Sequence, residues 1–295
     1  MQNAHNTLGL IGLGLVGSAL VERFSQAGFA IAGYDNNPSK ITQHGSRIDP
    51  CGSPAEVAAN ARRIVLSLPD SSIVNTVVEG KEGILETAQP GAFIIDTTTA
   101  DPVMSTDLAL RLHQKGIHFL DATILGSSQQ VCDGDALVMV GGEKSILDLC
   151  ADVFQTFALK TCHMGSFGKG AEAKLIVNLV LGLNRLVFAE GLVLAQKTGV
   201  DLHVLLDVLK SGAAYSRVMD TKGDKMIYSD FSPQARLSQH LKDVGLILDL
   251  GERTHTALPI SALHAQLLRS GVALGFGDQD NSAIIEVLRK MSGIS

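Results

Sequence analysis

Short apolar runs alternate with stretches of helical period over the first half of the chain. The clearest helix start is the sequence SPAE at 53–56, where Ser can cap the helix, Pro occupies its first turn and Glu completes a capping box. The apolar runs begin near Leu8, Ile31, Ile64, Ala92, Ile117, Ala136 and Leu159. This alternation predicts a doubly wound parallel sheet that is covered by helices.

After Gly165 the strand-like runs stop and the pattern becomes helical. Helices are predicted at about 169–198, 201–210, 237–253, 259–274 and 281–291. No low-complexity linker separates the two halves, so the boundary is expected at the start of the long helix. The fold class predicted is therefore α/β, with a sheet domain over residues 1–165 and an all-α C-terminal domain over 166–295.

Composition narrows the class of protein. Of 295 residues, 45% are hydrophobic and 18% are charged, which indicates a globular protein rather than a disordered one. The 24 basic and 30 acidic residues give a net charge of -6, so no broad positive field would attract nucleic acid or an anionic membrane. We therefore expect a small-molecule substrate, with no nucleic-acid partner and no membrane partner.

Two long apolar stretches raise the question of a membrane or secretion signal. The first, over 8–19, contains regular glycines and follows a start without Lys or Arg, unlike a signal peptide. The second, over 175–196, carries a polar load that a lipid-spanning helix rarely has, namely Asn178, Asn184, Arg185 and Glu190. The four cysteines lack paired CxxC spacing and are interpreted as reduced thiols. A cytoplasmic location is expected.

A glycine motif of the form GxGxxG lies where the first buried strand meets a helix. Gly12 permits a tight turn, Gly14 lets the backbone approach a pyrophosphate, and Gly17 allows the helix to lie close to the strand. The next strand ends at Asp35, whose carboxylate can accept hydrogen bonds from an adenosine ribose. Together they predict a Rossmann-type dinucleotide site. The predicted contacts are Gly12, Leu13, Gly14, Leu15, Val16, Gly17, Asp35 and Asn36.

The residues after the second strand favour NAD over NADP. Asp35 can accept both ribose hydroxyls of NAD, whereas the 2'-phosphate of NADP would bring negative charge against this carboxylate. No Arg occupies 36–39, and the nearest basic residues are Lys40 and Arg47. The alternative is that Asp35 caps the following turn and the asparagines after it form a neutral phosphate cradle that tolerates NADP.

A lysine on the long helix is the candidate proton carrier. Lys174 and Asn178 are four residues apart and therefore share one face of the helix. Apolar neighbours would remove water from the lysine and lower its pKa towards a value useful for proton transfer. Asn178 could hold the lysine head group or a substrate oxygen. The simpler interpretation is a lysine whose head group reaches water beside an ordinary interhelical asparagine.

Several motifs, in order along nearly the whole length, resemble the β-hydroxyacid dehydrogenase family, which contains 3-hydroxyisobutyrate dehydrogenase and tartronate semialdehyde reductase. The motifs are GLGLVG at 12–17, LPD at 68–70, DTTT at 96–99 before Pro102, GKG at 168–170 before Lys174, KD at 242–243 and DNSA at 280–283. The resemblance implies that Lys174 is the catalytic acid/base and that Asn178 contacts the substrate. It also implies that the cofactor or active site is lined by Leu68, Pro69, Asp70, Thr99 and Lys242.

The chain departs from this family where relatives hold the substrate carboxylate. The usual DAPVSGG is DATILGS at 121–127, so that Leu125 replaces the serine and Ser127 replaces a glycine. Val177 replaces an asparagine that many relatives carry, and Ala235 and Asn281 stand where aromatic residues are common. The predicted substrate contacts are Leu125, Gly126, Ser127 and Ser128. Hydroxyls at 127 and 128 and the amide of Gln129 are either replacement donors or part of an ordinary polar loop.

Residues and resemblance together predict an NAD-dependent oxidoreductase that interconverts a small β-hydroxy acid and its semialdehyde in a cleft between the domains. Lys174 would move the hydroxyl proton and Asn178 would orient the reacting oxygen. A homodimer or homotetramer is expected, because a small helical domain would not cover the apolar long helix alone.

Three alternatives stay open. The first is a non-catalytic dinucleotide-binding sensor, and the second is a reductase of a non-carboxylate carbonyl or imine. The third is an oxidative decarboxylase of the 6-phosphogluconate type, for which the chain is short and lacks a His before Asn178. No metal is expected, since the nine histidines include no HExxH pair.

Overall fold

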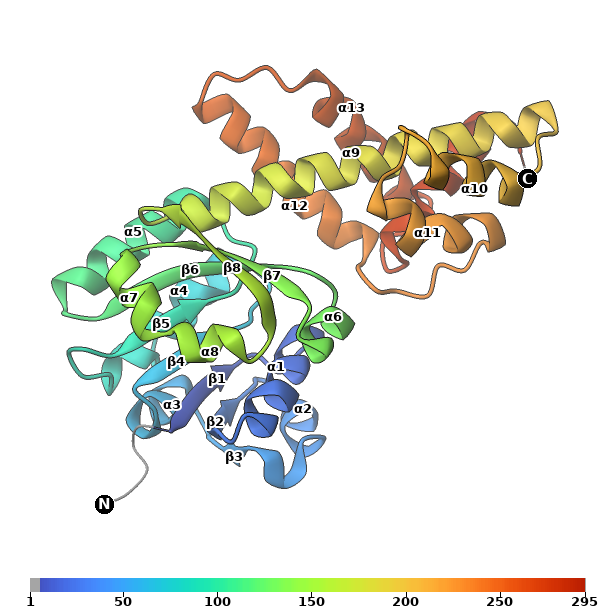
Figure 1. Cartoon of the computed structure of the whole chain (residues 1–295). Coiled ribbons are helices and arrows are strands. Elements are labelled where there is room, and N and C mark those ends of the chain that lie inside the picture. Colours follow the sequence, from blue (N-terminus) through green and yellow to red (C-terminus); the bar gives the residue numbers. More distant parts are fainter. Residues whose placement is uncertain (1–5, 295) are drawn as a thin grey trace. The chain divides into compact units, whose positions relative to one another are not determined.

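The chain divides into two compact units at Lys174, inside a long helix (Figure 1). The computed structural model describes residues 6–294. The first unit contains an eight-stranded sheet with helices on its faces, and the described part of the second unit is helical. This is the predicted fold class, a Rossmann-type sheet domain followed by a helical one.

The sheet has the strand order β3-β2-β1-β4-β5-β6-β7-β8. Its strands are β1 (Thr7–Ile11), β2 (Ala30–Tyr34), β3 (Asp49–Pro50), β4 (Arg63–Leu66), β5 (Phe93–Asp96), β6 (His118–Leu125), β7 (Ala136–Gly141) and β8 (Ala158–Gly165). All seven predicted strands are present. The additional strand β3 has only two residues, both exposed, and therefore gives no apolar run in the sequence.

One strand pair differs from the predicted parallel sheet. β6 and β7 are antiparallel, while the other neighbouring strands are parallel. The segment between β6 and β7, residues 126–135, is shorter than the dozen or so residues that a parallel crossover needs. An apolar run alone does not give the direction of a strand. In the sequence, only the short connection before β7 indicated that this strand is antiparallel to β6.

The helices of the first unit cover both faces of the sheet. They are α1 (Leu15–Gln26), α2 (Pro38–Thr42), α3 (Pro54–Asn60), α4 (Ser71–Glu79), α5 (Pro102–Gln114), α6 (Ser128–Asp133), α7 (Lys144–Leu149), α8 (Ala151–Gln155) and the start of α9 (Lys169–Thr198), with short 3-10 helices at η1 (Gly45–Arg47) and η2 (Ile84–Glu86). As predicted, the Ser53 side chain caps α3 by accepting a hydrogen bond from the Glu56 amide, with Pro54 in the first turn. The predicted capping box is not closed, because the Glu56 carboxylate accepts from the Gly52 amide at 2.6 Å and not from the Ser53 amide.

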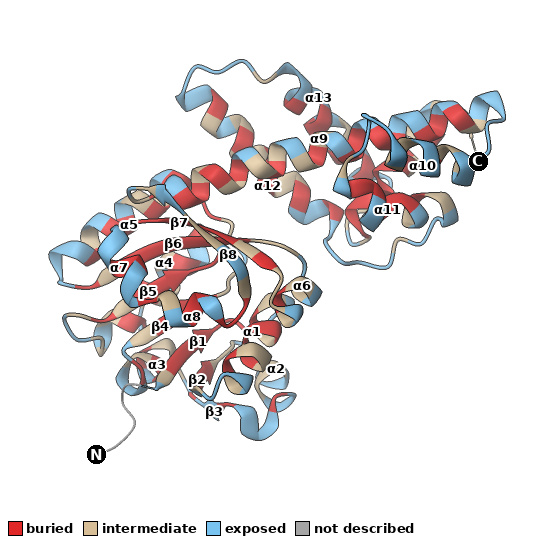
Figure 2. Ribbon diagram, in the orientation of Figure 1, coloured by how far each residue is buried: buried red, intermediate tan, exposed pale blue. Residues whose placement is uncertain are grey.

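Alternate residues of the central strands enter two separate cores. Leu8 and Leu10 of β1 pack with Phe24 of α1 on one face, whereas Ile64 and Leu66 of β4 pack on the other face. Side chains of successive strand residues point to opposite sides of a sheet, so strands buried on both faces read as continuous apolar runs. Figure 2 shows these strands buried, with exposed residues on the outer sides of the helices.

The second unit contains the rest of α9 with α10 (Leu202–Ser211), α11 (Arg217–Tyr228), α12 (Leu237–Arg253), α13 (Pro259–Ala273), η3 (Asn281–Ala283) and α14 (Ile284–Met291). The sequence did not predict α11. This helix is mostly polar and has Gly223 in its middle, so it lacks a clear apolar stripe. A Cβ on Gly223 would lie 2.8 Å from the Leu206 side chain, which shows how closely α10 and α11 pack.

Helix α9 is long and apolar enough to cross a membrane by length and composition alone, and no other helix among residues 6–294 meets that test. A core helix meets the same test. Leu175, Ala189 and Leu192 are fully buried within the chain, as in a core helix. Other apolar side chains of α9 are exposed, including Val187 at 64% and Leu194 at 65%.

Candidate active site

The glycines of the fingerprint loop differ in what their small size permits. Gly12 has φ +93°, and a Cβ there would lie 2.2 Å from the Ser67 carbonyl oxygen, while a Cβ on Gly17 would lie 1.9 Å from the Gly12 carbonyl oxygen. The fold itself therefore requires these two glycines. A Cβ on Gly14, the N-cap of α1, would meet no described atom within 4 Å. The open space beside Gly14 fits a ligand phosphate approaching the backbone.

The carboxylate of Asp35 is joined to this loop. Its Oδ2 accepts a hydrogen bond from the Leu13 amide at 2.7 Å, and its Oδ1 accepts one from the Asn37 amide at 2.9 Å. The predicted alternative of a turn cap is thus present in the Asn37 contact. Each carboxylate oxygen keeps a further lone pair, so Asp35 can still accept from ribose hydroxyls. Asn37 itself caps α2 through the Ser39 amide.

The loops after β4 and β5 lie at the same edge of the sheet as the fingerprint loop. In the strand register Ile11 is paired with Leu66, and Leu66 with Asp96. The predicted residues Leu68, Pro69 and Thr99 follow these strand ends directly, and the Leu68 amide donates to Thr98 Oγ1 at 3.3 Å. Strand ends at this edge, beside the point where the strand order reverses, are where doubly wound folds bind ligands.

Asp70 has a structural contact at the same edge. Its Oδ1 accepts hydrogen bonds from the amides of Ser72 and Ile73, and it caps α4. The side chain is therefore engaged in starting the helix. Its predicted role at the cofactor stays a prediction.

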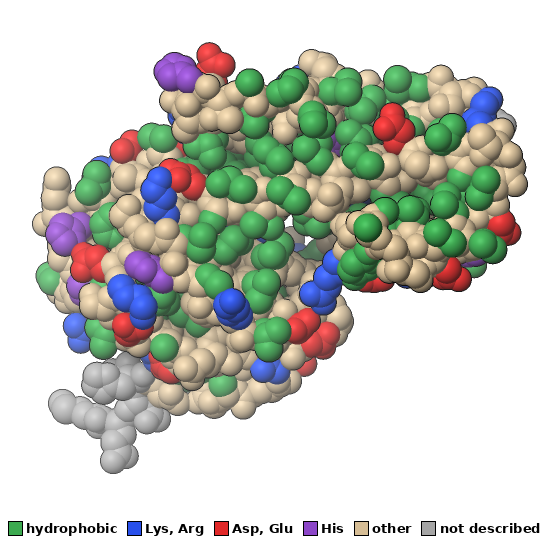
Figure 3. Space-filling view, turned by 45° about the horizontal axis from the view of Figure 1, so that its top comes forward, with side chains coloured by type: hydrophobic (Ala, Val, Ile, Leu, Met, Phe, Trp, Pro, Cys, Tyr) green, Lys and Arg blue, Asp and Glu red, His purple; other side chains and the backbone are tan. Residues whose placement is uncertain are grey.

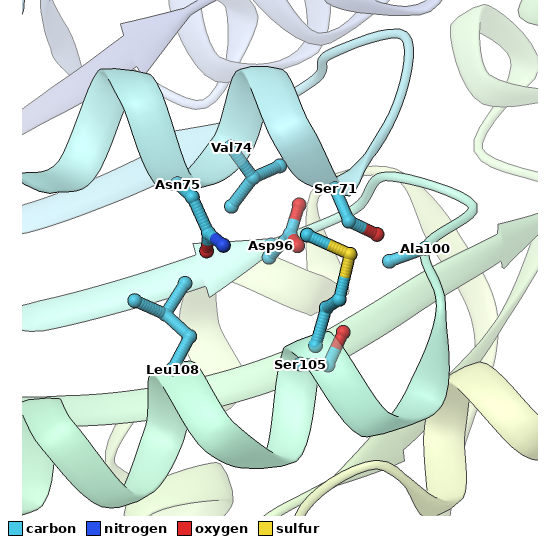
Figure 4. Close-up of a pocket in the computed structure, with 8 residues that line it drawn as sticks. Ser71, Val74, Asn75, Asp96, Ala100, Ser105 and Leu108 are labelled. Atoms are coloured by element: carbon cyan, nitrogen blue, oxygen red, sulfur yellow. The ribbon is translucent and has the colours of Figure 1, made fainter. Parts of the chain in front are cut away.

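A small cavity lies behind this edge, between α4 and α5 (Figure 4). It is lined by Ser71, Val74, Asn75, Asp96, Ala100, Met104, Ser105 and Leu108. Burial raises the pKa of Asp96 to about 7, opposed by hydrogen bonds from Thr98. Because no predicted substrate residue lines this cavity, we do not assign it as the substrate site.

Lys174 reaches the end of β6. Its Nζ donates a hydrogen bond to the Ile124 carbonyl oxygen at 2.6 Å, and the residue is half-buried. Asp96 is paired in register with Asp121, and β6 continues past that level to Leu125. The amine therefore lies at the sheet edge where the fingerprint loop and the two following loops meet. A partner on the backbone carries no sequence signal, so this contact was not predicted.

Asn178 lies one turn further along α9 and contacts a carboxylate instead of the lysine. Its Nδ2 donates to Asp243 Oδ2 at 3.1 Å, and both residues are buried. Lys242 Nζ lies 3.4 Å from Asp243 Oδ1. The second unit thus brings together Asn178, Lys242 and Asp243. The sequence contained one available signal for Asp243, because it lies on the buried stripe of α12 with Val244 and Ile247.

The predicted substrate loop is largely occupied with its own structure. Ser127 Oγ accepts from the Gln130 amide while Gln130 Oε1 accepts from the Ser127 amide, which is a capping box for α6. Gln129 Nε2 donates to Asp133 at 2.9 Å. In these contacts Ser127 Oγ is an acceptor and Gln129 uses one amide N–H, so the Ser127 hydroxyl and the second N–H of Gln129 can still donate. Both predicted interpretations of this loop therefore stay open. Leu125 and Ser128 are half-buried and stay candidate substrate contacts.

Comparisons with known proteins give a consistent result. Residues 7–165 match the family described as the NAD binding domain of 6-phosphogluconate dehydrogenase, and residues 168–288 match the NAD-binding domain of NADP-dependent 3-hydroxyisobutyrate dehydrogenase. The chain is 32% identical over 285 residues to glyoxylate/succinic semialdehyde reductase 1 of Arabidopsis thaliana, covering 96% of this chain and 98% of that protein.

Two further relatives cover nearly the full length. The 2-(hydroxymethyl)glutarate dehydrogenase of Eubacterium barkeri is 30% identical over 292 residues, which is 98% of this chain and 96% of that protein. The solved structure of 3-hydroxyisobutyrate dehydrogenase from Mycobacterium tuberculosis with L-serine has a TM-score of 0.86 and 26% identity, covering 96% of this chain and 99% of the other. From these matches and the site described above, the chain belongs to the β-hydroxyacid dehydrogenase family and is an NAD(P)-dependent oxidoreductase acting on a hydroxyl group.

Proposed function

We propose that the protein interconverts a small β-hydroxy acid and its semialdehyde with NAD, and that Lys174 is the general acid/base. The observation that carries this proposal is the half-buried Lys174 amine, held on the Ile124 carbonyl at the edge where the fingerprint loop lies. The relatives named above support the substrate class, because their names pair a hydroxyl or aldehyde group with a carboxylic acid.

The residues at the loop fit a dinucleotide. Open space at Gly14 admits a phosphate, and Asp35 presents acceptors for ribose hydroxyls. When bound, the nicotinamide supplies or accepts the hydride. The chain contributes the proton transfer: Lys174 Nζ removes the hydroxyl proton in oxidation and returns it in reduction. The Ile124 carbonyl accepts one N–H in either protonation state, and so keeps the amine in place throughout.

Asn178 is proposed to orient the reacting oxygen. One of its amide N–H groups is engaged by Asp243, which fixes the orientation of the side chain, and the second N–H can donate to a substrate oxygen. A donor at this position would stabilise negative charge that develops on that oxygen during hydride transfer. The buried contact therefore presets the amide before the substrate binds.

A second candidate function is the reduction of a non-carboxylate carbonyl or imine. It is favoured by one observation: Leu125 offers an apolar side chain where relatives present a serine. A panel of small hydroxy acids, aldehydes and imines, followed at the absorbance band of the reduced nicotinamide, separates the two functions. Turnover of no compound in the panel would favour the non-catalytic sensor, and would count against both.

Replacing Leu125 by serine is expected to raise kcat/KM for 3-hydroxyisobutyrate by about 3- to 30-fold, because a substrate carboxylate gains a hydrogen-bond donor. Leu125→Ala is the control, since it removes the same bulk without adding a hydroxyl. An equal gain in both variants would mean that space, and not the donor, limits the substrate. No gain in a well-folded Leu125→Ser would mean that the backbone of the loop already holds the acid.

The cofactor preference is tested by comparing kcat/KM for NAD and NADP, with NAD expected to be favoured about tenfold or more because Asp35 repels a 2'-phosphate. Asp35→Asn removes the negative charge but keeps an acceptor for the Leu13 amide. This variant should lower the ratio of kcat/KM for NAD to kcat/KM for NADP. A preference for NADP in the unaltered protein would refute the assignment. Lys40 and Arg47 would then be the cations to replace. Burial and the positive charges of Arg47 and Lys40 lower the pKa of the neighbouring His44.

We also propose that copies of the chain associate in the cytoplasm as a homodimer or homotetramer. Hydrophobic side chains gather on the surface of the second unit (Figure 3). Exposed apolar residues of the second unit include Val187 and Leu194 of α9 and Val204 and Val208 of α10. Val187 and Leu194 are seven residues apart and therefore share one face of α9, and exposed apolar side chains on one helix face are typical of an interface between subunits.

A further inference from the structure

A buried carboxylate fixes the start of α9 to the sheet. Asp121 in β6 is 1% exposed, and its Oδ1 accepts a hydrogen bond from the Gly168 amide while its Oδ2 accepts one from the Ala171 amide, both at 2.9 Å. The first amides of a helix have no partners inside the helix, and a negative charge near them is favourable. Both oxygens of Asp121 are thus bound to the first turn of α9.

A second contact joins the same helix turn to the same strand. The Thr123 hydroxyl, fully buried, donates to the Gly170 carbonyl oxygen at 3.0 Å. A Cβ on Gly170 would lie 2.3 Å from the Asp121 carbonyl oxygen, and one on Gly141 would lie 2.7 Å from the Gly170 amide nitrogen. The backbone of α9 therefore packs directly on β6 and β7, with no room for a shift towards the sheet.

Lys174 follows this anchored turn and returns to β6. From Ala171 to Lys174 the helix rises about one turn, and the Lys174 amine donates to Ile124, the residue after Thr123 on the strand. Asp121 and Thr123 share one side of β6, since side chains alternate along a strand. The strand thus determines both where α9 begins and where its lysine amine is held.

We propose that Asp121 is a positioning residue for Lys174. By holding the first turn of α9 on β6, Asp121 fixes the place of the lysine amine, and the Thr123 hydrogen bond to Gly170 is a second contact of this kind. This inference rests on the proposed acid/base role of Lys174. A displacement of about 1 Å at a reacting group can lower a rate on the order of 100-fold, so a fixed helix start is a requirement for proton transfer.

Among the described aspartates that accept from amides at a helix start, Asp121 and Asp280, the cap of η3, are buried. Asp201, which caps α10, is exposed, and Asp70 of α4 is half-buried. Burial raises the pKa of Asp121 to about 6, although the amides of Ala171 and Gly168 lower it. A surface cap would satisfy the same amides without removing a carboxylate from water. What the buried acid adds is a rigid link between the strand and the helix.

Hydrogen–deuterium exchange tests the link without a substrate. In Asp121→Asn, the amide group can accept from only one of the two backbone donors and turns an N–H towards the other, so exchange over residues 168–174 should rise about tenfold or more. The matched control is Asp96→Asn, a buried acid paired in register with Asp121 whose Oδ1 accepts from the Thr98 amide. Unchanged exchange in Asp121→Asn, or an equal rise in the control, would overturn the proposal.

A double-mutant cycle tests the action through Lys174. Asp121→Asn should lower kcat by about 10- to 100-fold with the NAD dissociation constant unchanged, and Thr123→Val should have a smaller effect that Thr123→Ser restores. In the Lys174→Met background, Asp121→Asn should lower kcat no further. If the two losses multiply in full, the positioning role fails while the acid/base role stands. If Lys174→Met alone keeps normal turnover, the proposed function itself fails, and the positioning role with it.

Discussion

Replacing Lys174 by methionine is expected to lower kcat by about 100-fold or more, the usual effect of removing a general acid/base. Methionine roughly keeps the length of the side chain but carries no proton, so no group at this place can accept the hydroxyl proton. The fingerprint loop and Asp35 are untouched by the change. The affinity for NADH, measured by the fluorescence of its reduced nicotinamide, should therefore stay within about twofold of the original value.

Lys169→Met is the matched control for this result. Lys169 lies on the same helix but is exposed and forms an ion pair with Glu172 at 2.6 Å. Its loss should leave kcat nearly unchanged, since exposed ion pairs contribute little. Near-normal turnover of a folded Lys174→Met, or an equal loss in both variants, would contradict the acid/base assignment.

Replacing Gly14 by alanine is expected to weaken NAD binding by about 10- to 100-fold without lowering Tm, because the added methyl group enters space that only the ligand needs. In the protein itself this Cβ meets nothing within 4 Å, and the backbone of Gly14, with φ -67°, is one that alanine adopts freely. Calorimetric titration with NAD and thermal unfolding without it give the two quantities separately.

Gly17→Ala provides the opposite case. Its Cβ would lie 1.9 Å from the Gly12 carbonyl oxygen, so the backbone must move and Tm should fall. Comparing the two variants separates the glycine required for ligand approach from the one required for folding. A Gly14→Ala protein that binds NAD as tightly as the original would contradict the pyrophosphate position proposed for this loop.

The strands and most helices were predictable because their apolar residues follow simple periods. The exceptions were elements without such a period: β3 has two exposed residues, and α11 is polar with a central glycine. The antiparallel direction of β7 was also not predicted, because strand direction depends on the length of the connection and not on the strand sequence. Local pattern thus gave the elements, and chain connectivity decided how one of them was placed.

The candidate site was predictable where a residue type is itself informative. Glycines in GxGxxG and a lysine among apolar residues stand out in a sequence. The partners of those residues do not, because Ile124 contributes only a backbone carbonyl. The buried acid Asp121 resembles a surface acid until the packing is known, and the capping contact of Ser127 also appears only in the structure.

The two edges of the sheet bear on how copies of this protein can meet. β3 ends at Pro50, which has no amide hydrogen to donate, and the strand is only two residues long. β8 at the other edge is longer, and its exposed residues are the charged Lys160, His163 and the apolar Leu159 and Met164. Short, proline-containing or lysine-bearing edges discourage the addition of a foreign strand. Amyloid-like stacking is thereby opposed most strongly at the β3 edge, whereas at the β8 edge the charge of Lys160 is the feature that opposes it.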